Sequence, residues 1–420
     1  MHSYLIVLGA LGFLMCEPAH AQDRAMELAS TLYGRHVVGY QGWFVCPSSP
    51  ESGGKWAHWF RGEGKTADDL RVDMWPDTAE LTAEERCSTG LKTGAGNEAV
   101  LFSSLNSKTV DRHFSWMKTY NIESVALQRF VSELTSSRKR AQRDIVLQNV
   151  VKSARTHKRA YFIYYDISGI EADKDLDILL ADWERLWKEN AIGQAGLYQM
   201  HRGKPVVGVW GLGFTSRAGS AKAAASLIAR LKSGSGAAPP ATIIGGVPTR
   251  WRGLSGDSKK EPEWADVYRS FDVISPWTVG RFKTPSTART FWTDRIVPDM
   301  AETSRLGIDY LPVIFPGYSA SNLKRKASEP NSIDRDCGRF YLEQVAAAEK
   351  FGARMLYTAM FDEFDEGTAI MKAAEPQNAL PVDGGLITPD AESCDTANDW
   401  YLSLAGQATR MLQTNRRGGQ

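Results

Sequence analysis

The chain has 420 residues, a formal net charge of +1, 13 Trp and 14 Tyr. A charge so close to zero gives no electrostatic reason to expect nucleic acid or an anionic membrane as a partner. The length fits two domains or one large α/β barrel with insertions. Aromatic side chains this frequent are consistent with a carbohydrate ligand, because flat apolar rings stack on the C–H faces of sugars.

The N-terminus has the pattern of a secretory signal peptide. Apolar residues run from Tyr4 to Met15, and Ala19-His20-Ala21 then offers small residues before a cleavage site. We therefore predict a signal peptide at residues 1–21, cleavage near Ala21, and export to the periplasm or the medium. No later run reaches about 18 apolar residues, so the sequence predicts no membrane span.

Cysteine usage agrees with an oxidising compartment. Cys16 lies in the predicted signal peptide, which leaves Cys46, Cys87, Cys337 and Cys394. An even number in an exported chain indicates disulfides, and four cysteines allow three pairings, of which Cys46–Cys87 with Cys337–Cys394 is the simplest. The chain has no Cys-x-x-Cys pair beside a histidine couple, so no zinc site is predicted.

Strand-like runs alternate with helical patterns along the rest of the chain. The expected strands are residues 37–44, 124–130, 160–166, 205–210, 242–245, 272–275, 310–315 and 355–361. The expected helices are residues 108–120, 135–157, 174–190, 219–232, 262–270, 287–306, 335–351 and 397–413. This alternation implies a parallel sheet, and its eight units favour a closed (β/α)8 TIM barrel over an open sheet. We predict a single domain at residues 22–414, with a long insertion after the first strand (45–107), and a flexible tail at 415–420.

In a barrel of this kind the functional site lies where strands end and the following loops begin. Polar and aromatic residues recur at those positions: Gln41, Trp43, Arg129, Asp166, Trp210, Arg250, Trp277, Arg281 and Tyr318. Each has an ordinary explanation by itself, such as an ion pair for Arg129, but their recurrence indicates a shared pocket. The insertion places aromatics beside acids, as in Asp73-Met74-Trp75-Pro76-Asp77. It could form one wall of that pocket or a hydrophobic patch under a loop.

An acidic cluster, Asp362-Glu363-Phe364-Asp365-Glu366, follows the last expected strand. Carboxylates this close repel one another, and proteins accept that cost where the carboxylates bind a metal or transfer protons. Glu363 and Glu366 are three residues apart, so a turn could aim both into one pocket. A solvated loop and a Ca²⁺ site are the alternatives. The spacing departs from that of calcium loops, so no metal is predicted.

Several motifs resemble glycoside hydrolase family 71/99-like proteins, a group related to the family 99 endo-α-mannosidases. The motifs are Gly39 to Phe44, Asp73 to Asp77, Leu127 to Phe130, Tyr165 to Gly169, Ile244 to Thr249, Ser275 to Arg281 and Met360 to Thr368. Family 99 has a (β/α)8 fold and an acidic motif, Asn-Glu-x-x-Glu-Gly-Thr, to which residues 362–368 are similar. Asp362 stands where the family has Asn, so mannoside specificity does not transfer safely.

The resemblance implies a retaining glycoside hydrolase that needs no metal or cofactor and acts on an oligo- or polysaccharide with α-linked mannose or glucose. It implies that Glu366 is the general acid/base. Glu363 would deprotonate the 2-hydroxyl of the substrate, which closes a 1,2-anhydro sugar that water then opens. The predicted substrate contacts are Tyr40, Gln41, Trp43, Asp73, Trp75, Arg129, Asp166, Trp210, Trp277, Arg281 and Asp362. An α-1,3-glucanase-like or pentosidase activity and a non-catalytic glycan-binding barrel are the alternatives, and the sequence leaves the oligomeric state open.

Overall fold

The fold is seen in a computed structural model of the chain, which describes residues 26–193, 197–389, 394 and 396–418. The predicted signal peptide, residues 1–21, lies outside the described residues. Helix α10 (Trp400–Gly418) continues through most of the segment for which the sequence predicts a flexible tail.

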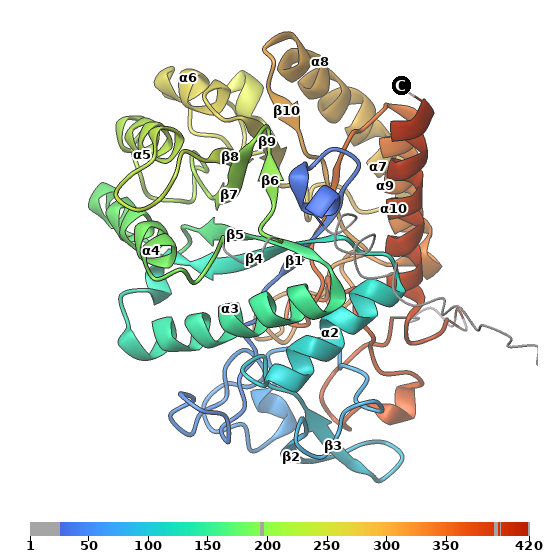
Figure 1. Ribbon diagram of the computed structural model, residues 1–420. Helices are drawn as coiled ribbons and strands as arrows, with labels where there is room; N and C mark the ends of the chain where they lie inside the picture. The colour runs from blue at the N-terminus through green and yellow to red at the C-terminus, as the bar shows by residue number, and fades with distance from the viewer. Residues whose placement is uncertain (1–25, 194–196, 390–393, 395, 419–420) are drawn as a thin grey trace, which may run out of the picture.

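Parallel strands occupy eight positions in the described part of the chain, at the centre of the molecule (Figure 1). They are β1 (His36–Tyr40), β4 (Ser124–Phe130), β5 (Ala160–Asp166), β7 (Lys204–Trp210), β8 (Thr242–Val247), β9 (Val273–Pro276), β10 (Asp309–Tyr310) together with β11 (Val313–Ile314), and β12 (Leu356–Thr358). Each lies within a few residues of an expected strand. A short strand, β6 (Met200–His201), pairs antiparallel with β7.

The seventh strand position closes the sheet into a barrel. β10 pairs with β9, whereas β11 pairs with β12, and only Leu311 and Pro312 separate the two short strands. Proline has no N–H to donate, which accounts for the interruption at this point. One segment of chain thus connects both ends of the strand order β9-β8-β7-β5-β4-β1-β12. The predicted TIM-barrel fold is confirmed.

The barrel strands are apolar along most of their length because both of their faces are covered. In β5, for example, every residue is buried until the strand ends at the partly exposed Asp166. Successive side chains of a strand point to opposite faces. In β4, Arg129 therefore points toward the surrounding helices, while Gln128 and Phe130 point toward the interior.

Helices surround the barrel (Figure 1). They are α2 (Ser107–Thr119), α3 (Ser137–His157), α4 (Leu176–Lys188), α5 (Ala221–Ser233), α6 (Glu263–Arg269), α7 (Pro285–Phe291), α8 (Val297–Arg305), α9 (Arg339–Lys350) and α10. Four of them begin at polar caps, where Asn106, Ser136, Ser220 and Thr284 accept a hydrogen bond from a backbone N–H of the first turn. The single helix expected at 287–306 is divided, because a π-helical turn, Trp292–Ile296, joins α7 to α8.

The insertion after β1 is a packed extension of the barrel. It contains an antiparallel hairpin, β2 (Cys87–Lys92) and β3 (Glu98–Leu101), at the lower edge of Figure 1. Trp59 is fully buried there against the rings of Phe44 and Phe102. The aromatics of the insertion therefore stabilise its own packing against the barrel.

Two disulfides have the pairing that the sequence analysis names as the simplest, Cys46–Cys87 and Cys337–Cys394. The first joins the start of the insertion to its strand β2, and the second joins the segment just before α9 to the segment before α10. Disulfides are consistent with a location outside the cytoplasm. Within the ranges that the structure describes, no helix is long and apolar enough to cross a membrane.

Candidate active site

A cavity of about 350 Å³ opens at the carboxyl ends of the barrel strands. Acidic, aromatic and cationic side chains share its wall. The lining residues are Gln41, Trp43, Gln128, Phe130, Tyr164, Asp166, Ser168, Trp210, Phe214, Ser216, Arg217, Trp277, Arg281, Met360, Glu363 and Glu366. Since this end of a TIM barrel carries the active site in enzymes with the fold, the cavity is the candidate active site.

Glu363 and Glu366 both line the cavity, but they have different hydrogen-bond partners. The Glu363 Oε1 accepts a hydrogen bond from Gln41 Nε2 at 2.7 Å, and its Oε2 accepts one from Thr368 Oγ1 at 2.8 Å. Among the described residues, no side chain donates to the Glu366 carboxyl group. Donors stabilise the ionised form of a carboxyl group. The two donors therefore offset part of the effect of burial on Glu363, whereas Glu366 has no such donor among the described residues.

Burial raises the pKa of both glutamates. For Glu363, burial and then the charges of Glu366 and Asp365 raise the pKa well above its ordinary value, against the donors just described. For Glu366, burial and then the charge of Asp365 raise the pKa to about 7, while Lys324 acts in the opposite direction. An acid with a pKa near 7 can hold a proton at neutral pH and still release it, as a general acid must.

Asp362 lies beneath the cavity and not in its wall. It is fully buried, and its two oxygens accept the backbone N–H groups of Gln41 at 2.7 Å and Gly42 at 2.9 Å. Burial raises its pKa to about 7. The structure therefore does not support a direct substrate contact by Asp362. Its side chain instead fastens the acidic loop to the end of β1, which brings Gln41 to Glu363.

Asp365 positions an aromatic wall of the cavity through a histidine, His58, that no sequence motif indicates. Its Oδ2 lies 3.0 Å from Nδ1 of His58, a residue of the insertion. The imidazole ring stacks on the indole of Trp43 with the ring centroids 3.9 Å apart. Burial raises the pKa of Asp365 to about 7 and lowers the pKa of His58 well below its ordinary value. The insertion thus supports the cavity from behind Trp43, although none of its described residues lines the cavity.

The four carboxylates of the acidic cluster point in different directions. Asp362 faces backbone N–H groups, Asp365 faces His58, and the two glutamates face the cavity. In the part of the chain that the structure describes, no three His, Cys, Asp or Glu side chains are grouped so that they could hold a metal ion. The calcium site considered from the sequence has no converging set of ligands here.

Four of the residues that the sequence places at strand ends line one side of the cavity, namely Asp166 at the end of β5, Trp210 at the end of β7, and Trp277 and Arg281 after β9. The two indoles meet edge to face, with ring centroids 5.7 Å apart. Burial raises the pKa of Asp166 to about 6, against a hydrogen bond of 2.6 Å from the Ser168 N–H. This side offers flat apolar surface together with a few polar groups, which is the usual make-up of a small-molecule site.

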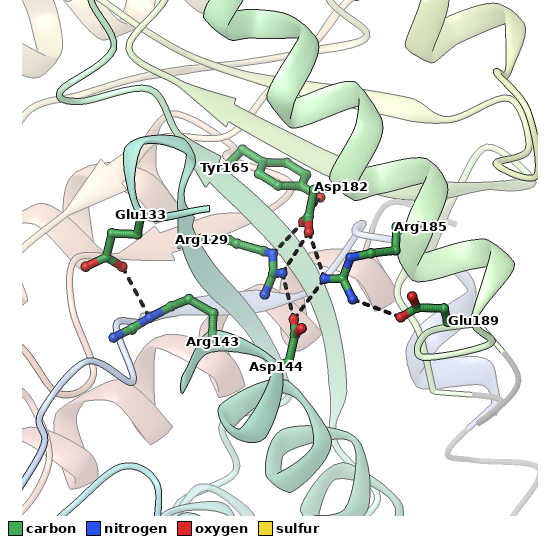
Figure 2. Close-up of polar contacts among 8 residues, drawn as sticks. All are labelled: Arg129, Glu133, Arg143, Asp144, Tyr165, Asp182, Arg185 and Glu189. Atoms are coloured by element: carbon green, nitrogen blue, oxygen red, sulfur yellow. Dashed lines mark hydrogen bonds and ion pairs between the residues drawn. The ribbon is translucent and has the colours of Figure 1, made fainter. Parts of the chain in front are cut away.

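Arg129 lies outside the cavity, in an ion network between β4 and the helices α3 and α4 (Figure 2). Its Nε and Nη2 atoms lie 2.5 Å and 2.7 Å from carboxylate oxygens of Asp182 and Asp144. Arg185 of α4 joins the same two acids. The prediction that Arg129 contacts substrate is therefore not supported, because the alternation of side chains turns it toward the helices.

Tyr40, Trp75 and Asp73 are also buried away from the cavity. The Tyr40 hydroxyl lies 2.9 Å from Nδ1 of His113, inside the aromatic packing between β1 and α2. Trp75 packs near Trp59 in the insertion. Asp73 accepts hydrogen bonds from the backbone N–H groups of residues 321 and 322 and from a hydroxyl at 319. These three residues belong to the packing around the site and do not line the cavity.

Several lining residues escape the sequence analysis, namely Gln128, Phe130, Tyr164, Ser168, Phe214, Ser216, Arg217 and Met360. The strand period contained a signal for some of them, since Gln128 and Phe130 flank Arg129 and must face the opposite side. Phe214, Ser216 and Arg217 lie in the loop after β7. No periodic pattern places loop residues, so the sequence offered no comparable signal for them.

Comparisons with known proteins identify the class of fold. No protein-family model and no curated protein matches this chain. Two structures of the GH99 endo-α-mannosidase from Bacteroides thetaiotaomicron, one in complex with Bis-Tris propane, match 92% of this chain and 100% of their own at 15% identity, with TM-scores of 0.64 and 0.61. A glycoside hydrolase-like protein matches 91% of this chain and 95% of its own at 13% identity, with a TM-score of 0.57.

The chain therefore has a glycoside hydrolase-like TIM-barrel fold. More narrowly, this fold is related to that of the GH99 endo-α-mannosidase, in agreement with the motif resemblance. At such low sequence identity the likeness concerns the fold, and the chemistry rests on the residues of the cavity.

Proposed function

We propose that this protein is an exported, retaining glycoside hydrolase that acts on α-linked glycans containing mannose or glucose. One observation carries the proposal. Glu363 and Glu366 share a cavity at the carboxyl end of a glycoside hydrolase-like barrel, and of the two only Glu363 receives side-chain hydrogen bonds from described residues. Acid/base cleavage of a glycosidic bond requires two carboxyl groups, one that accepts a proton while the other gives one, and the different hydrogen-bond partners of this pair suit them to the two roles.

In the first step, the cleaved bond is that of an α-mannosyl residue, whose 2-hydroxyl lies on the ring face opposite the leaving group. Glu363 removes the proton of this hydroxyl, and the resulting oxygen attacks the anomeric carbon. The bond from that carbon to the glycosidic oxygen breaks, and Glu366 gives its proton to the leaving oxygen. The product of this step is a 1,2-anhydro sugar. Gln41 and Thr368 support this step because their hydrogen bonds stabilise the ionised form of Glu363, the form that accepts the proton.

In the second step, Glu366 takes a proton from water, whose oxygen attacks the anomeric carbon from the face that the leaving group occupied. The bond between the anomeric carbon and the 2-oxygen breaks, and Glu363 returns its proton to that oxygen. Each glutamate is restored, and two inversions give net retention. No step requires a metal or a cofactor.

The aromatic side of the cavity supports a sugar as the ligand. Trp43, Trp210 and Trp277 offer ring surfaces in its wall, and the stack of His58 on Trp43 limits the movement of that indole. Rigid aromatic rings gain contact with the apolar face of a sugar at a low entropic cost. The two disulfides support export, because such bonds persist in oxidising compartments.

The proposal is tested by measuring product release from a panel of α-mannan and α-glucan oligosaccharides. Wild-type protein should release reducing ends, and Glu366→Gln and Glu363→Gln should each lower turnover at least about a thousandfold without altering thermal unfolding. Glu349→Gln, a change at an exposed position of α9, is the matched control. Saturable binding with no product from wild type would identify a glycan-binding barrel instead. The linkages of the products would separate a mannosidase from a glucanase-like or pentosidase activity.

A further inference from the structure

The cavity contains cations that the proposed bond cleavage does not use. Arg217 lies in the loop after β7 and Arg281 in the segment after β9, and both line the wall beside the tryptophans. Lys324 lies close enough to act on the pKa of Glu366. A site whose chemistry depends on carboxyl groups does not need guanidinium groups for that chemistry, so these cations call for another explanation.

The two arginines differ in their partners. The Nη2 atom of Arg281 lies 2.8 Å from Asp257, so its charge is already matched by an acid. Arg217 forms no ion pair with any residue that the structure describes. Its Nη1 atom makes only long hydrogen bonds to its neighbour Ser216, at 3.3 Å to the carbonyl oxygen and 3.4 Å to the hydroxyl. Its Nε atom is buried and has no acceptor among the described residues.

Arg217 is nonetheless held in place. Its guanidinium carbon lies 5.2 Å from the centroid of the Trp210 ring, and Phe214 packs on the same indole with centroids 5.0 Å apart. A cation over an aromatic face is attracted to the ring and loses part of its freedom. The side chain is thus a partly buried, pre-positioned cation with no ion-pair partner among the described residues.

A charged group of this kind favours an anionic ligand over a neutral one. A partly desolvated guanidinium gains most from a carboxylate, sulfate or phosphate oxygen, which it can bind with two parallel N–H groups. A sugar hydroxyl would satisfy one N–H and leave the charge unmatched. Asp166 is near enough for the charge of Arg217 to lower its pKa, but no ion pair joins these two side chains in the part of the chain that the structure describes.

We infer that Arg217 binds an anionic substituent of the glycan, so that the substrate carries a carboxylate, as in a uronic acid, or a sulfate or phosphate ester on the sugar that contacts Trp210. This inference rests on the proposed function, because it specifies the substrate class of the same cavity. Arg217 is then a determinant of specificity and takes no part in bond cleavage.

Binding to matched oligosaccharides tests the inference. Titrations use the Glu366→Gln variant, so that no ligand is consumed, with a neutral α-linked oligosaccharide and its uronic acid, sulfate ester and phosphate ester counterparts. At least one anionic form should bind about tenfold more tightly than the neutral one, and added salt should reduce that preference. The anionic form that binds most tightly identifies whether the group bound by Arg217 is a carboxylate, a sulfate or a phosphate.

Two substitutions of Arg217 and a control separate charge from packing. Arg217→Met in the same background keeps the length of the side chain and should bring the anionic ligands to the affinity of the neutral one. Arg217→Lys should retain part of the preference, because it keeps the charge and loses the planar fork. Arg230→Met removes a cation of α5 that pairs with Asp177 outside the cavity and should change neither affinity.

Equal affinity for neutral and anionic ligands would overturn the inference, and so would an equal loss of both in Arg217→Met or the absence of binding to every anionic form. The result is independent of the hydrolase proposal. An anionic preference in a protein that releases no product would leave the inference standing and remove the proposed activity. Hydrolysis of neutral glycans without such a preference would support the proposed activity and overturn the inference.

Discussion

Gln41 reaches Glu363 because Asp362, the residue next to that glutamate, holds the backbone of Gln41. The Asp362 Oδ1 accepts the Gln41 backbone N–H at 2.7 Å, and the Gln41 Nε2 donates to the Glu363 Oε1 at 2.7 Å. The end of β1 and the acidic loop after β12 therefore position each other through one residue. The carboxylate beneath the cavity and the proposed base in its wall are joined in this way, and they differ in their hydrogen-bond partners.

Gln41→Ala should reduce the activity without unfolding the protein. It removes one of the two side-chain donors to Glu363 and leaves the backbone contact with Asp362 intact. We expect kcat/KM to fall by about ten- to a hundredfold, the usual worth of a hydrogen bond to a charged group. The acidic limb of the pH profile should also move to higher pH, because Glu363 then holds its proton more tightly. Gln142→Ala in α3 is the control, and an unshifted profile would show that Gln41 does not stabilise the ionised Glu363.

Asp362 should make the folded state less stable as the pH rises. Its pKa is about 7 in the folded protein and starts from an ordinary value of 3.8. The folded state thus binds this proton more tightly, and the resulting stabilisation is complete below the ordinary pKa and lost as the pH rises through about 7. Asp362→Asn cannot ionise, so its free energy of unfolding should decline less between about pH 5 and about pH 8, by on the order of 1–3 kcal/mol.

Urea unfolding of wild type and Asp362→Asn at several pH values measures this difference. The amide offers only one acceptor oxygen to the two N–H groups that Asp362 now satisfies, so the variant should also be less stable by an amount that does not depend on pH. Parallel curves for the two proteins would mean that Asp362 does not titrate in this range.

His58→Ala should weaken substrate binding more than it slows the chemical step. The imidazole stacks on Trp43 in the cavity wall and contacts Asp365, so its loss frees the indole without removing a reacting group. We expect KM to rise about three- to tenfold, with kcat changed by less than about threefold. Steady-state kinetics with a cleaved oligosaccharide measures both. His157→Ala, which removes a contact with Asp111 at the surface, is the control; a loss confined to kcat would place His58 in the chemistry instead.

Arg129→Met should destabilise the fold by about 3–5 kcal/mol, because it leaves Asp182 buried and incompletely paired. The remaining folded protein should keep its activity, since Arg129 does not line the cavity. Adding Asp182→Leu should recover much of the lost stability, as the unpaired charge is removed together with its partner. Denaturant unfolding of the three proteins tests this. If Arg129→Met were as stable as wild type but less active, Arg129 would instead be a substrate contact.

Arg129 also shows where the sequence predicts the site well and where it does not. The barrel follows from strands that are apolar throughout and from their alternation with helices, and the acidic cluster after the last strand leads directly to Glu363 and Glu366. At the carboxyl end of a strand, however, some side chains face the barrel interior and their neighbours face the surrounding helices. The residue type at one position does not show which of these two directions its side chain takes. The sequence therefore predicts Arg129 in the cavity, which Gln128 and Phe130 line instead.

Contacts between residues that are far apart in the chain cannot be predicted from the sequence pattern, for a different reason. His58 joins Asp365 across 307 residues of chain, and Asp73 joins residue 322 across 249. Such pairs depend on how the insertion packs against the barrel, and no local periodicity contains that packing. The residue types of Trp59 and Trp75 would suit a pocket wall equally well, but both side chains are buried in the core of the insertion.

The most direct measurement is proton NMR of the anomeric signals during cleavage of an α-linked oligosaccharide by the protein. If Glu363 and Glu366 act as proposed, the first product has the α-configuration of the substrate, and Glu366→Gln forms no product under the same conditions. A first product of β-configuration would contradict the two-step mechanism. Undiminished turnover by Glu366→Gln would contradict the assignment of the acid itself.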